Sequence, residues 1–244
     1  MPSLLYQEPS LAAVYDLFNA WGADNDFYLG LLKPVVNTVL DIGCGTGLLA
    51  VAMAKQAQVT GLEPAAAMLD IARQRPGGER VRWLQTDARD FALDERFDLI
   101  YCTGHAFQVF LTEADRQALW RNVKAHLARE GEFVFETRNP WPRPWEQWGE
   151  RPPRRVSHAE WGEVEISHLI RSVDGDRVEF QARYRFLDSG QVFEIEEQLC
   201  FCDLPTLQAE AASAGLRVDA VYGDWQQGEW REDSPEIILR LRHG

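Results

Sequence analysis

A buried strand that runs straight into a glycine-rich turn constrains the fold of this chain more than any other segment. Residues 39–47 read Val-Leu-Asp-Ile-Gly-Cys-Gly-Thr-Gly, and a helical pattern begins at Leu48. Glycines lack the Cβ atoms that would obstruct a ligand, and the first amides of the following helix are unpaired, so the turn presents backbone N–H groups. The segment predicts a ligand-binding turn at the edge of a sheet, and by itself it suits several cofactors.

Apolar strand patterns and helical patterns alternate along most of the chain. Before the first strand, residues 11–33 have the apolar spacing of two amphipathic helices broken near Gly22. The alternation is typical of an α/β fold in which a mostly parallel sheet carries helices on both faces. Strand patterns lie at residues 38–42, 58–62, 80–84, 97–101, 132–136, 216–222 and 237–241, and helical patterns at 48–57, 65–74, 112–129 and 205–214.

An insert with a different pattern interrupts this alternation late in the chain. Residues 139–155 are rich in proline, which excludes a helix or a central strand there. Residues 178–186 alternate apolar and polar side chains, as a strand with one wet face does, and 164–170 and 192–201 look like its neighbours. We therefore expect an α/β domain made of residues 1–138 and 203–244, with cap helices at 1–36, and an antiparallel β lid at 139–202.

Charge and composition exclude several classes of partner. The 244-residue chain has a formal net charge of -13 at pH 7, which argues against a nucleic-acid partner. No stretch approaches the roughly 18 consecutive apolar residues of a membrane span, and no N-terminal segment has a signal-peptide pattern. The four cysteines lack C-x-x-C spacing and the histidines lack metal-ligand spacing. We predict a cytoplasmic protein without a metal, either a monomer or a homodimer.

Two details of the glycine-rich turn discriminate between cofactors. A dinucleotide-binding G-x-G-x-x-G turn would place its third glycine at position 48, where this chain has Leu48, so an NAD-dependent oxidoreductase is disfavoured. Residues 40–47 instead resemble the first motif of the class I S-adenosylmethionine-dependent methyltransferases, and the match extends over nearly the whole chain. The resemblance implies a Rossmann-like sheet, S-adenosyl-L-methionine as the cofactor and S-adenosyl-L-homocysteine as the product.

Acidic residues lie at the ends of three consecutive predicted strands. The resemblance implies that Asp41, Gly43 and Gly45 surround the methionine part of the cofactor. It also implies that Glu63 binds both ribose hydroxyls and that Asp87 contacts the adenine. Each acid alone is better explained as a helix cap or a solvated carboxylate, but three at successive strand ends favour a cofactor site. The other cofactor-binding residues that we infer are Cys44, Pro64, Met68, Ala88, Thr103 and Tyr15, although simple packing explains Met68 equally well.

The segment after the fourth predicted strand should face the transferred methyl group, because ligands in open α/β sheets lie beyond the carboxyl ends of the strands. This segment, residues 102–108, lacks the Asn/Asp-Pro-Pro-aromatic motif that is typical of nucleic-acid adenine or cytosine N-methyltransferases. His105 is the candidate catalytic residue, since an imidazole beside the cofactor could remove a proton from an amine or a hydroxyl. A histidine that only packs beside the cofactor is an equally good interpretation.

The lid insert favours a small-molecule methyl acceptor, with transfer to N or O rather than C. The insert resembles lids of family members that act on amino sugars, peptide amino termini and other natural products. Trp141, Trp145 and Trp148 alternate with arginines that include Arg138, and these residues could form a basic aromatic wall for a flat or anionic substrate or simply pack on the sheet. The alternatives are a protein or RNA acceptor, or a nucleotide-binding module without catalysis.

Overall fold

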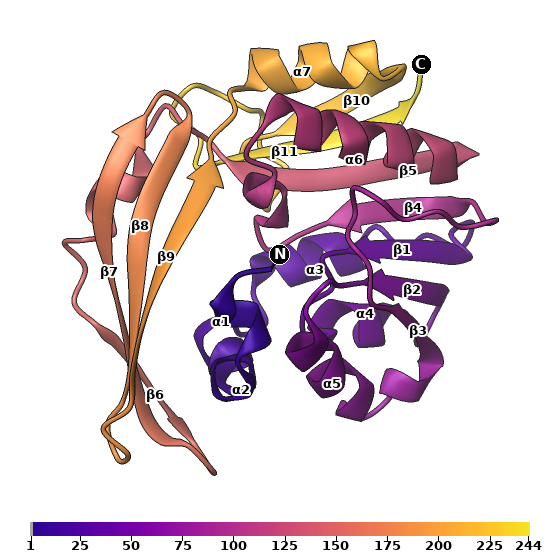
Figure 1. The fold of residues 1–244 in the computed structure, drawn as a ribbon. Helices are drawn as coiled ribbons and strands as arrows, with labels where there is room; N and C mark the ends of the chain where they lie inside the picture. The colour runs from indigo at the N-terminus through magenta and orange to yellow at the C-terminus, as the bar shows by residue number, and fades with distance from the viewer. Residues whose placement is uncertain (1) are drawn as a thin grey trace.

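The computed structural model describes residues 2–244 and contains two separate β-sheets (Figure 1). The larger sheet has seven strands in the order β10-β11-β5-β4-β1-β2-β3. Strands β5, β4, β1, β2 and β3 are parallel, and β11 runs antiparallel between β5 and β10. The expected mostly parallel α/β sheet is confirmed. Its strands are β1 (Thr38–Ile42), β2 (Gln58–Leu62), β3 (Val81–Leu84), β4 (Phe97–Cys102), β5 (Leu127–Arg138), β10 (Leu216–Tyr222) and β11 (Glu236–His243).

Helices cover both faces of this sheet because its strands are apolar on both sides. One face packs against α6 and α7 through a cluster that includes Trp120, Phe133 and Leu207. The other face packs against α3 and α4 through a second cluster that includes Tyr28 and Val134. The helices are α1 (Leu4–Gln7), α2 (Pro9–Phe18), α3 (Ala23–Leu29), α4 (Leu48–Met53), α5 (Ala66–Gln74), α6 (Glu113–His126) and α7 (Leu204–Ser213), with short 3-10 turns at η1 (Gly78–Arg80), η2 (Ala106–Val109) and η3 (Pro144–Gln147).

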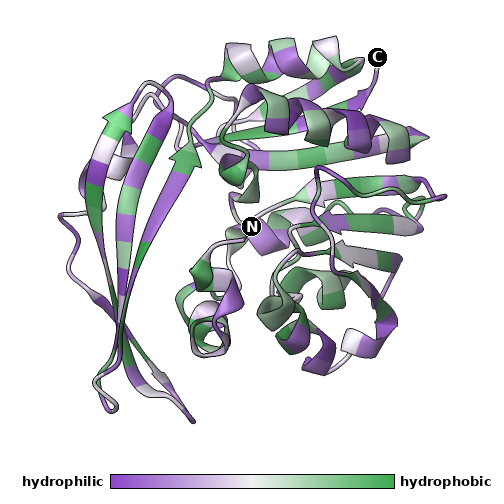
Figure 2. Ribbon diagram, viewed as in Figure 1, coloured by the Kyte–Doolittle hydropathy of each residue, from purple (hydrophilic) through white to green (hydrophobic). Residues whose placement is uncertain are grey.

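The smaller sheet is antiparallel, with four strands in the order β6-β7-β8-β9. These strands are β6 (Arg154–His158), β7 (Gly162–Asp174), β8 (Arg177–Phe186) and β9 (Val192–Cys200). Apolar and polar residues alternate along them (Figure 2), and the apolar side chains of one face pack against α2 through contacts of Leu11 and Phe18 with residues such as Tyr184. Helix α2 therefore lies between this sheet and α5, and it joins the two halves of the molecule.

Several sequence-based bounds differ from the structure, and one strand was missed. The helix expected at residues 112–129 ends at His126, because Leu127 adopts an extended conformation and begins β5, which is much longer than expected. Strand β6 was missed altogether: its residues are mostly exposed, and they follow a proline-rich segment that hid its edge position beside β7. The break near Gly22 is confirmed, since Gly22 is the N-cap of α3. In residues 2–244 no helix is both long enough and apolar enough to cross a membrane.

Candidate active site

Asp41 is a buried carboxylate at the carboxyl end of β1, and only one of its two oxygens is satisfied by the chain. The Tyr101 hydroxyl on neighbouring β4 donates a hydrogen bond of 2.7 Å to Oδ2. The other oxygen, Oδ1, has no partner among the described residues. Burial raises the pKa of Asp41 to about 7, because removal from water penalises the charged form more than the Tyr101 hydrogen bond favours it. A cationic ligand group would satisfy this oxygen.

The glycine-rich turn folds as its sequence predicts. Gly43, Gly45 and Gly47 all adopt positive φ angles, of 75°, 53° and 75°, which favour glycine. A Cβ atom on Gly47 would lie 2.5 Å from the ring of Trp83, so close packing also requires this glycine. Cys44 is buried within the turn, and the Gly45 amide points at the next strand end, where it meets Glu63.

Glu63 follows β2 and is buried beside the turn. Its two carboxylate oxygens accept hydrogen bonds from backbone amides, Oε1 from Ala65 (2.9 Å) and Oε2 from Gly45 (3.2 Å). Burial raises the pKa of Glu63, while the two amides oppose this rise. The amides fix the orientation of the carboxylate and leave lone pairs free, because each oxygen can accept two hydrogen bonds. Pro64 lies next along the chain at the same edge, where its carbonyl accepts from Gln85 (3.4 Å).

Asp87, after β3, differs from the other two acids because the chain itself neutralises it. The Arg89 side chain donates to both of its oxygens, from Nε at 2.9 Å and from Nη2 at 2.7 Å. These hydrogen bonds lower the pKa of Asp87. Arg89 also pairs with Asp115, at the start of α6. Ala88 is buried, and its carbonyl accepts a hydrogen bond from Asn122. Sequence reasoning did not anticipate the pairing of Asp87 with Arg89.

The N-terminal helices close over this edge of the sheet. Tyr15 on α2 lies in one apolar cluster with Met68 on α5, and burial raises the pKa of Tyr15 to about 12. Asp16 ties the same helix to the glycine-rich turn: its carboxylate accepts from the Thr46 hydroxyl (2.6 Å) and pairs with Arg75. Residues near the start of the chain therefore lie against the ends of β1 and β2.

His105 follows β4 and is enclosed by acidic residues from strands far along the chain. Its φ angle is 58°, which turns its backbone N–H toward Glu136 Oε1 at 2.7 Å. Its ring Nε2 lies 3.0 Å from Glu236 Oε2. Burial lowers the pKa of His105 to about 3 and raises the pKa of Glu236 to about 8. Both shifts favour the uncharged form of each group, a neutral imidazole and a neutral carboxyl group.

Sequence reasoning missed Glu136 and Glu236 as functional candidates. Glu136 is fully buried on β5 and also accepts from the Tyr28 hydroxyl of α3. Burial raises its pKa as well. For Glu136 the available signal was the one that identified Asp41, namely an acidic residue near the end of an apolar strand, whereas Glu236 begins its strand and gave no such signal. Thr103 lies nearby, and its buried Oγ1 has no hydrogen-bond partner among the described residues.

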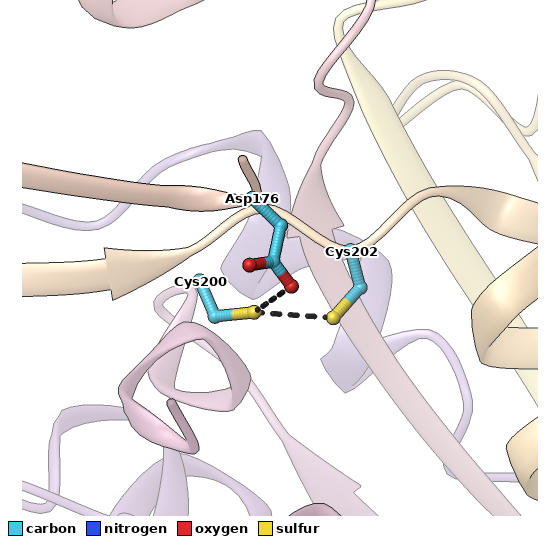
Figure 3. A group of neighbouring side chains, drawn as sticks. All are labelled: Asp176, Cys200 and Cys202. Atoms are coloured by element: carbon cyan, nitrogen blue, oxygen red, sulfur yellow. Dashed lines mark hydrogen bonds between the residues drawn. The ribbon is translucent and has the colours of Figure 1, made fainter. Parts of the chain in front are cut away.

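A cluster of two thiols and a carboxylate lies where β9 leads toward α7 (Figure 3). The Cys200 thiol lies 3.2 Å from Cys202 Sγ and donates to Asp176 Oδ2 at 3.2 Å. Three potential metal ligands therefore lie within 4.8 Å of one another, which the prediction of no metal did not foresee. The Arg116 guanidinium, 3.5 Å from Cys200 Sγ, opposes a further positive charge at this point. The thiols are accounted for as hydrogen-bonded groups that join the insert to the larger sheet.

The chain matches known methyltransferases in sequence. The family profile described as "Methyltransferase domain" matches residues 39–131. Over 227 residues the chain is 33% identical to the dTDP-4-amino-2,3,4,6-tetradeoxy-D-glucose N,N-dimethyltransferase of Saccharopolyspora spinosa, with 88% of each protein covered. The chain belongs to the class I S-adenosylmethionine-dependent methyltransferases. This family membership confirms the enzyme class and the cofactor that the glycine-rich turn indicated.

More distant proteins match the methyltransferase over almost its full length. The cypemycin N-terminal methyltransferase of a Streptomyces species is 24% identical, with 97% of both chains covered. The crystal structure of an S-adenosylmethionine-dependent methyltransferase from Clostridium acetobutylicum superimposes with a TM-score of 0.80 at 16% identity, covering 96% of this chain and 98% of that one. The second match shows that the fold is shared over almost the full length of both chains.

The polar groups at the strand ends fit S-adenosylmethionine. Asp41 Oδ1 and Thr103 Oγ1 are two of the four buried side-chain atoms that have no hydrogen-bond partner in residues 2–244. A carboxylate at this point suits a ligand with a cationic amino group and disfavours a pyrophosphate. Glu63 offers a fixed carboxylate of the kind that accepts from two vicinal hydroxyls. The hydrogen-bond acceptors at the strand ends of the methyltransferase therefore match this cofactor better than a dinucleotide.

Proposed function

We propose that this methyltransferase transfers a methyl group to an amine nitrogen of a small molecule. The observation that carries the proposal is the pair of carboxylates, fully buried Glu136 and half-buried Glu236, that contacts His105 where the methyl acceptor would approach. Acidic groups removed from water favour a cationic ligand, because they gain their charge only when a positive group lies beside them. The names of the relatives agree, since the one from Saccharopolyspora spinosa acts on an amino sugar and the one from Streptomyces on the N-terminus of cypemycin.

The cofactor is held by residues of the first three strand ends. Asp41 binds the methionine amino group with its free Oδ1, Gly43, Cys44 and Gly45 line the methionine part, and Glu63 binds the ribose hydroxyls. The remaining contacts that we propose come from Pro64, Met68, Ala88, Thr103 and Tyr15. Asp87 reaches the adenine only if its pairing with Arg89 leaves a lone pair available. When bound, the cofactor supplies an activated methyl group, so the enzyme mainly has to align the nucleophile.

The pair of His105 and Glu236 removes a proton from the amine. A protonated amine has no lone pair, so it must lose a proton before it can attack. Glu236 accepts this proton once its own carboxyl group is ionised, above its raised pKa of about 8. His105 orients that carboxylate through the 3.0 Å contact and stays neutral, because its pKa is about 3. Glu136, which the His105 amide and Tyr28 hold in place, stabilises the approaching cation.

The pH dependence of methyl transfer tests this proposal. With a panel of primary amines, release of S-adenosylhomocysteine by wild type should accelerate as the pH rises through about 8. In Glu236→Gln the maximal rate should fall, and the remaining rise should follow only the pKa of each amine. Glu63→Ala should abolish turnover at low cofactor concentration. Transfer to alcohols but not to amines, or identical pH profiles for wild type and Glu236→Gln, would overturn the proposal.

We assign cofactor binding to the part of the chain with the larger sheet and the lid to the part with the smaller sheet. Residues 1–138 and 203–244 form the cofactor-binding domain, with residues 1–36 as its cap, and residues 139–202 form a lid over the acceptor. The support is that each sheet has its own apolar cluster and that α2 joins them. All four cysteines are free, which agrees with a reducing cytoplasmic compartment. The enzyme acts as a monomer or a homodimer, without a nucleic-acid partner.

A further inference from the structure

Arg138 is a part-buried cation that makes no ion pair within 4.0 Å with any described residue, and the charges of Glu236 and Glu136 act on it only from a longer distance. Of its five N–H donors, one is engaged by a side chain, through the 2.7 Å hydrogen bond from Nη1 to Gln108 Oε1. No carboxylate of residues 2–244 lies within 4.0 Å of its guanidinium nitrogens. Burial lowers the pKa of Arg138, but an arginine keeps its charge in proteins. An unpaired charge removed from water is costly, and an anion that pairs with it recovers part of that cost.

The chain fixes the position of this guanidinium from two sides. Gln108 is fully buried, and its Nε2 donates to the Cys200 carbonyl at 3.2 Å, so its side-chain oxygen is turned toward Arg138. On the other side the guanidinium carbon lies 5.3 Å from the ring centre of Trp148, within cation–π range. The Trp148 ring packs edge-to-face on Phe180 of β8, with ring centres 5.3 Å apart. These contacts preorganise a cation that otherwise makes no ion pair.

Arg138 lies next to the groups that we assign to the amine. It is the last residue of β5, and its Cα partner across the antiparallel ladder is Glu236. Glu136 lies two residues earlier, so both side chains leave β5 on the same face of the sheet. Trp148 belongs to the insert and extends the same neighbourhood toward β8. A positive group thus flanks the buried acids, on the side of the smaller sheet.

We propose that Arg138 binds an anionic group of the methyl acceptor, a phosphate or a carboxylate, and thereby selects acceptors that carry this group near the nucleophilic nitrogen. The planar guanidinium can donate two parallel hydrogen bonds to either group. An acceptor that lacks the anion leaves the charge unpaired, which is the arrangement that gives a site strong discrimination. The inference rests on the proposed amine methylation only for the identity of the nucleophile.

Anion binding is measured first, without any acceptor. The protein loaded with S-adenosylhomocysteine is unfolded thermally in inorganic phosphate, in acetate, and in chloride at equal ionic strength. We expect phosphate or acetate to raise the Tm saturably in wild type and not in Arg138→Gln. Arg143→Gln is the matched control, because Arg143 lies in the same segment but is exposed and paired with Glu146. Equal shifts in wild type and Arg138→Gln, or no shift in wild type, would overturn the proposal.

Selectivity is measured next, with pairs of amines that differ only in one phosphate or carboxylate group. Wild type should favour the anionic member, and Arg138→Lys should lower kcat/KM for that member by on the order of 10- to 100-fold, mainly through KM, because lysine keeps the charge but loses the planar fork. Turnover of the neutral member should change little. If neither amine is methylated but Arg138-dependent anion binding persists, the proposed nucleophile is wrong and the anion site stands. Equal kcat/KM for both members in wild type overturns the anion site alone.

The carboxylate of the cofactor could provide the same chemistry, and a binding comparison separates the two sources. S-adenosylhomocysteine carries this carboxylate, and 5′-methylthioadenosine lacks it. If Arg138 serves the acceptor, Arg138→Gln binds both nucleosides as tightly as wild type does. A loss of affinity for S-adenosylhomocysteine alone would assign Arg138 to the cofactor and overturn the proposal.

Discussion

Two buried polar regions of this molecule differ in whether the chain satisfies them. Between α6 and α7, the Arg116 guanidinium donates to Glu210 through Nε and Nη2, and the Trp120 indole N–H donates to the same carboxylate at 3.1 Å. At the ends of β1 and β4, Asp41 Oδ1 and Thr103 Oγ1 have no partner in residues 2–244. Buried polar groups that the chain completes stabilise the fold, whereas those that it leaves incomplete are available to a ligand.

The largest expected effect is a loss of stability when the satisfied polar region between α6 and α7 is disrupted. Glu210→Gln removes the negative partner and leaves the Arg116 charge buried, so the free energy of unfolding should fall by about 3–5 kcal/mol. Urea denaturation measures this loss. The affinity of the folded enzyme for S-adenosylhomocysteine should not change. The double variant Arg116→Met with Glu210→Leu should recover most of the stability, and a loss below about 1 kcal/mol in Glu210→Gln would erase the contrast between the two regions.

The next largest effect is a loss of cofactor affinity when a polar group at the strand ends is removed. Glu63→Ala removes a fixed carboxylate that we assign to two hydroxyls, so affinity for S-adenosylhomocysteine should fall on the order of 100-fold, or about 3 kcal/mol. Calorimetric titration measures this change. Stability without ligand should change less than in Glu210→Gln, because only two amide hydrogen bonds are lost. Glu79→Ala, which alters an exposed acid, is the control, and equal affinities of wild type and Glu63→Ala would refute the assignment.

The smallest effect has the opposite sign. Asp41 has a pKa near 3.9 in an unfolded chain and about 7 in the folded protein. As the pH rises from about 4 to 7 the unfolded chain loses this proton first, so Asp41 increasingly destabilises the fold, and it continues to do so at higher pH. The shift corresponds to at most about 4 kcal/mol at pH 8. Because an amide oxygen accepts a weaker hydrogen bond from Tyr101 than a carboxylate does, Asp41→Asn should recover only about 1–2 kcal/mol of this at pH 8 and hardly anything at pH 4. Denaturation at both pH values tests this, and a variant that is less stable at pH 8 would contradict it.

Local patterns were sufficient where a function depends on consecutive residues. The glycines of residues 39–47 predicted a tight turn after a strand, and the structure has this turn, with positive φ angles at all three glycines. Asp41 and Glu63 were identifiable because the carboxyl ends of neighbouring parallel strands meet at one edge, so acids at successive strand ends lie close together. The assignment of these residues to the cofactor is still a prediction.

Long-range contacts escaped the sequence because no periodicity encodes which distant strands become neighbours. Glu236 reaches His105 across 131 positions, and it does so only because β11 inserts antiparallel beside β5. The pairing of Asp87 with Arg89 was missed for a different reason. The local sequence shows that the two charges are close along the chain, but not that the Arg89 side chain points toward Asp87 rather than into solvent.

The sequence by itself therefore determined the α/β fold with its late insert, because strand period and turn glycines are properties of short segments. The resemblance of residues 40–47 to a known motif then indicated the cofactor and the enzyme family. Only the tertiary structure decided which groups face the acceptor. Strand pairing placed Glu136, Arg138 and Glu236 beside His105. Burial then set the charge states of these groups, raising the pKa of the acids and lowering that of the imidazole, since solvation depends on everything packed around a side chain.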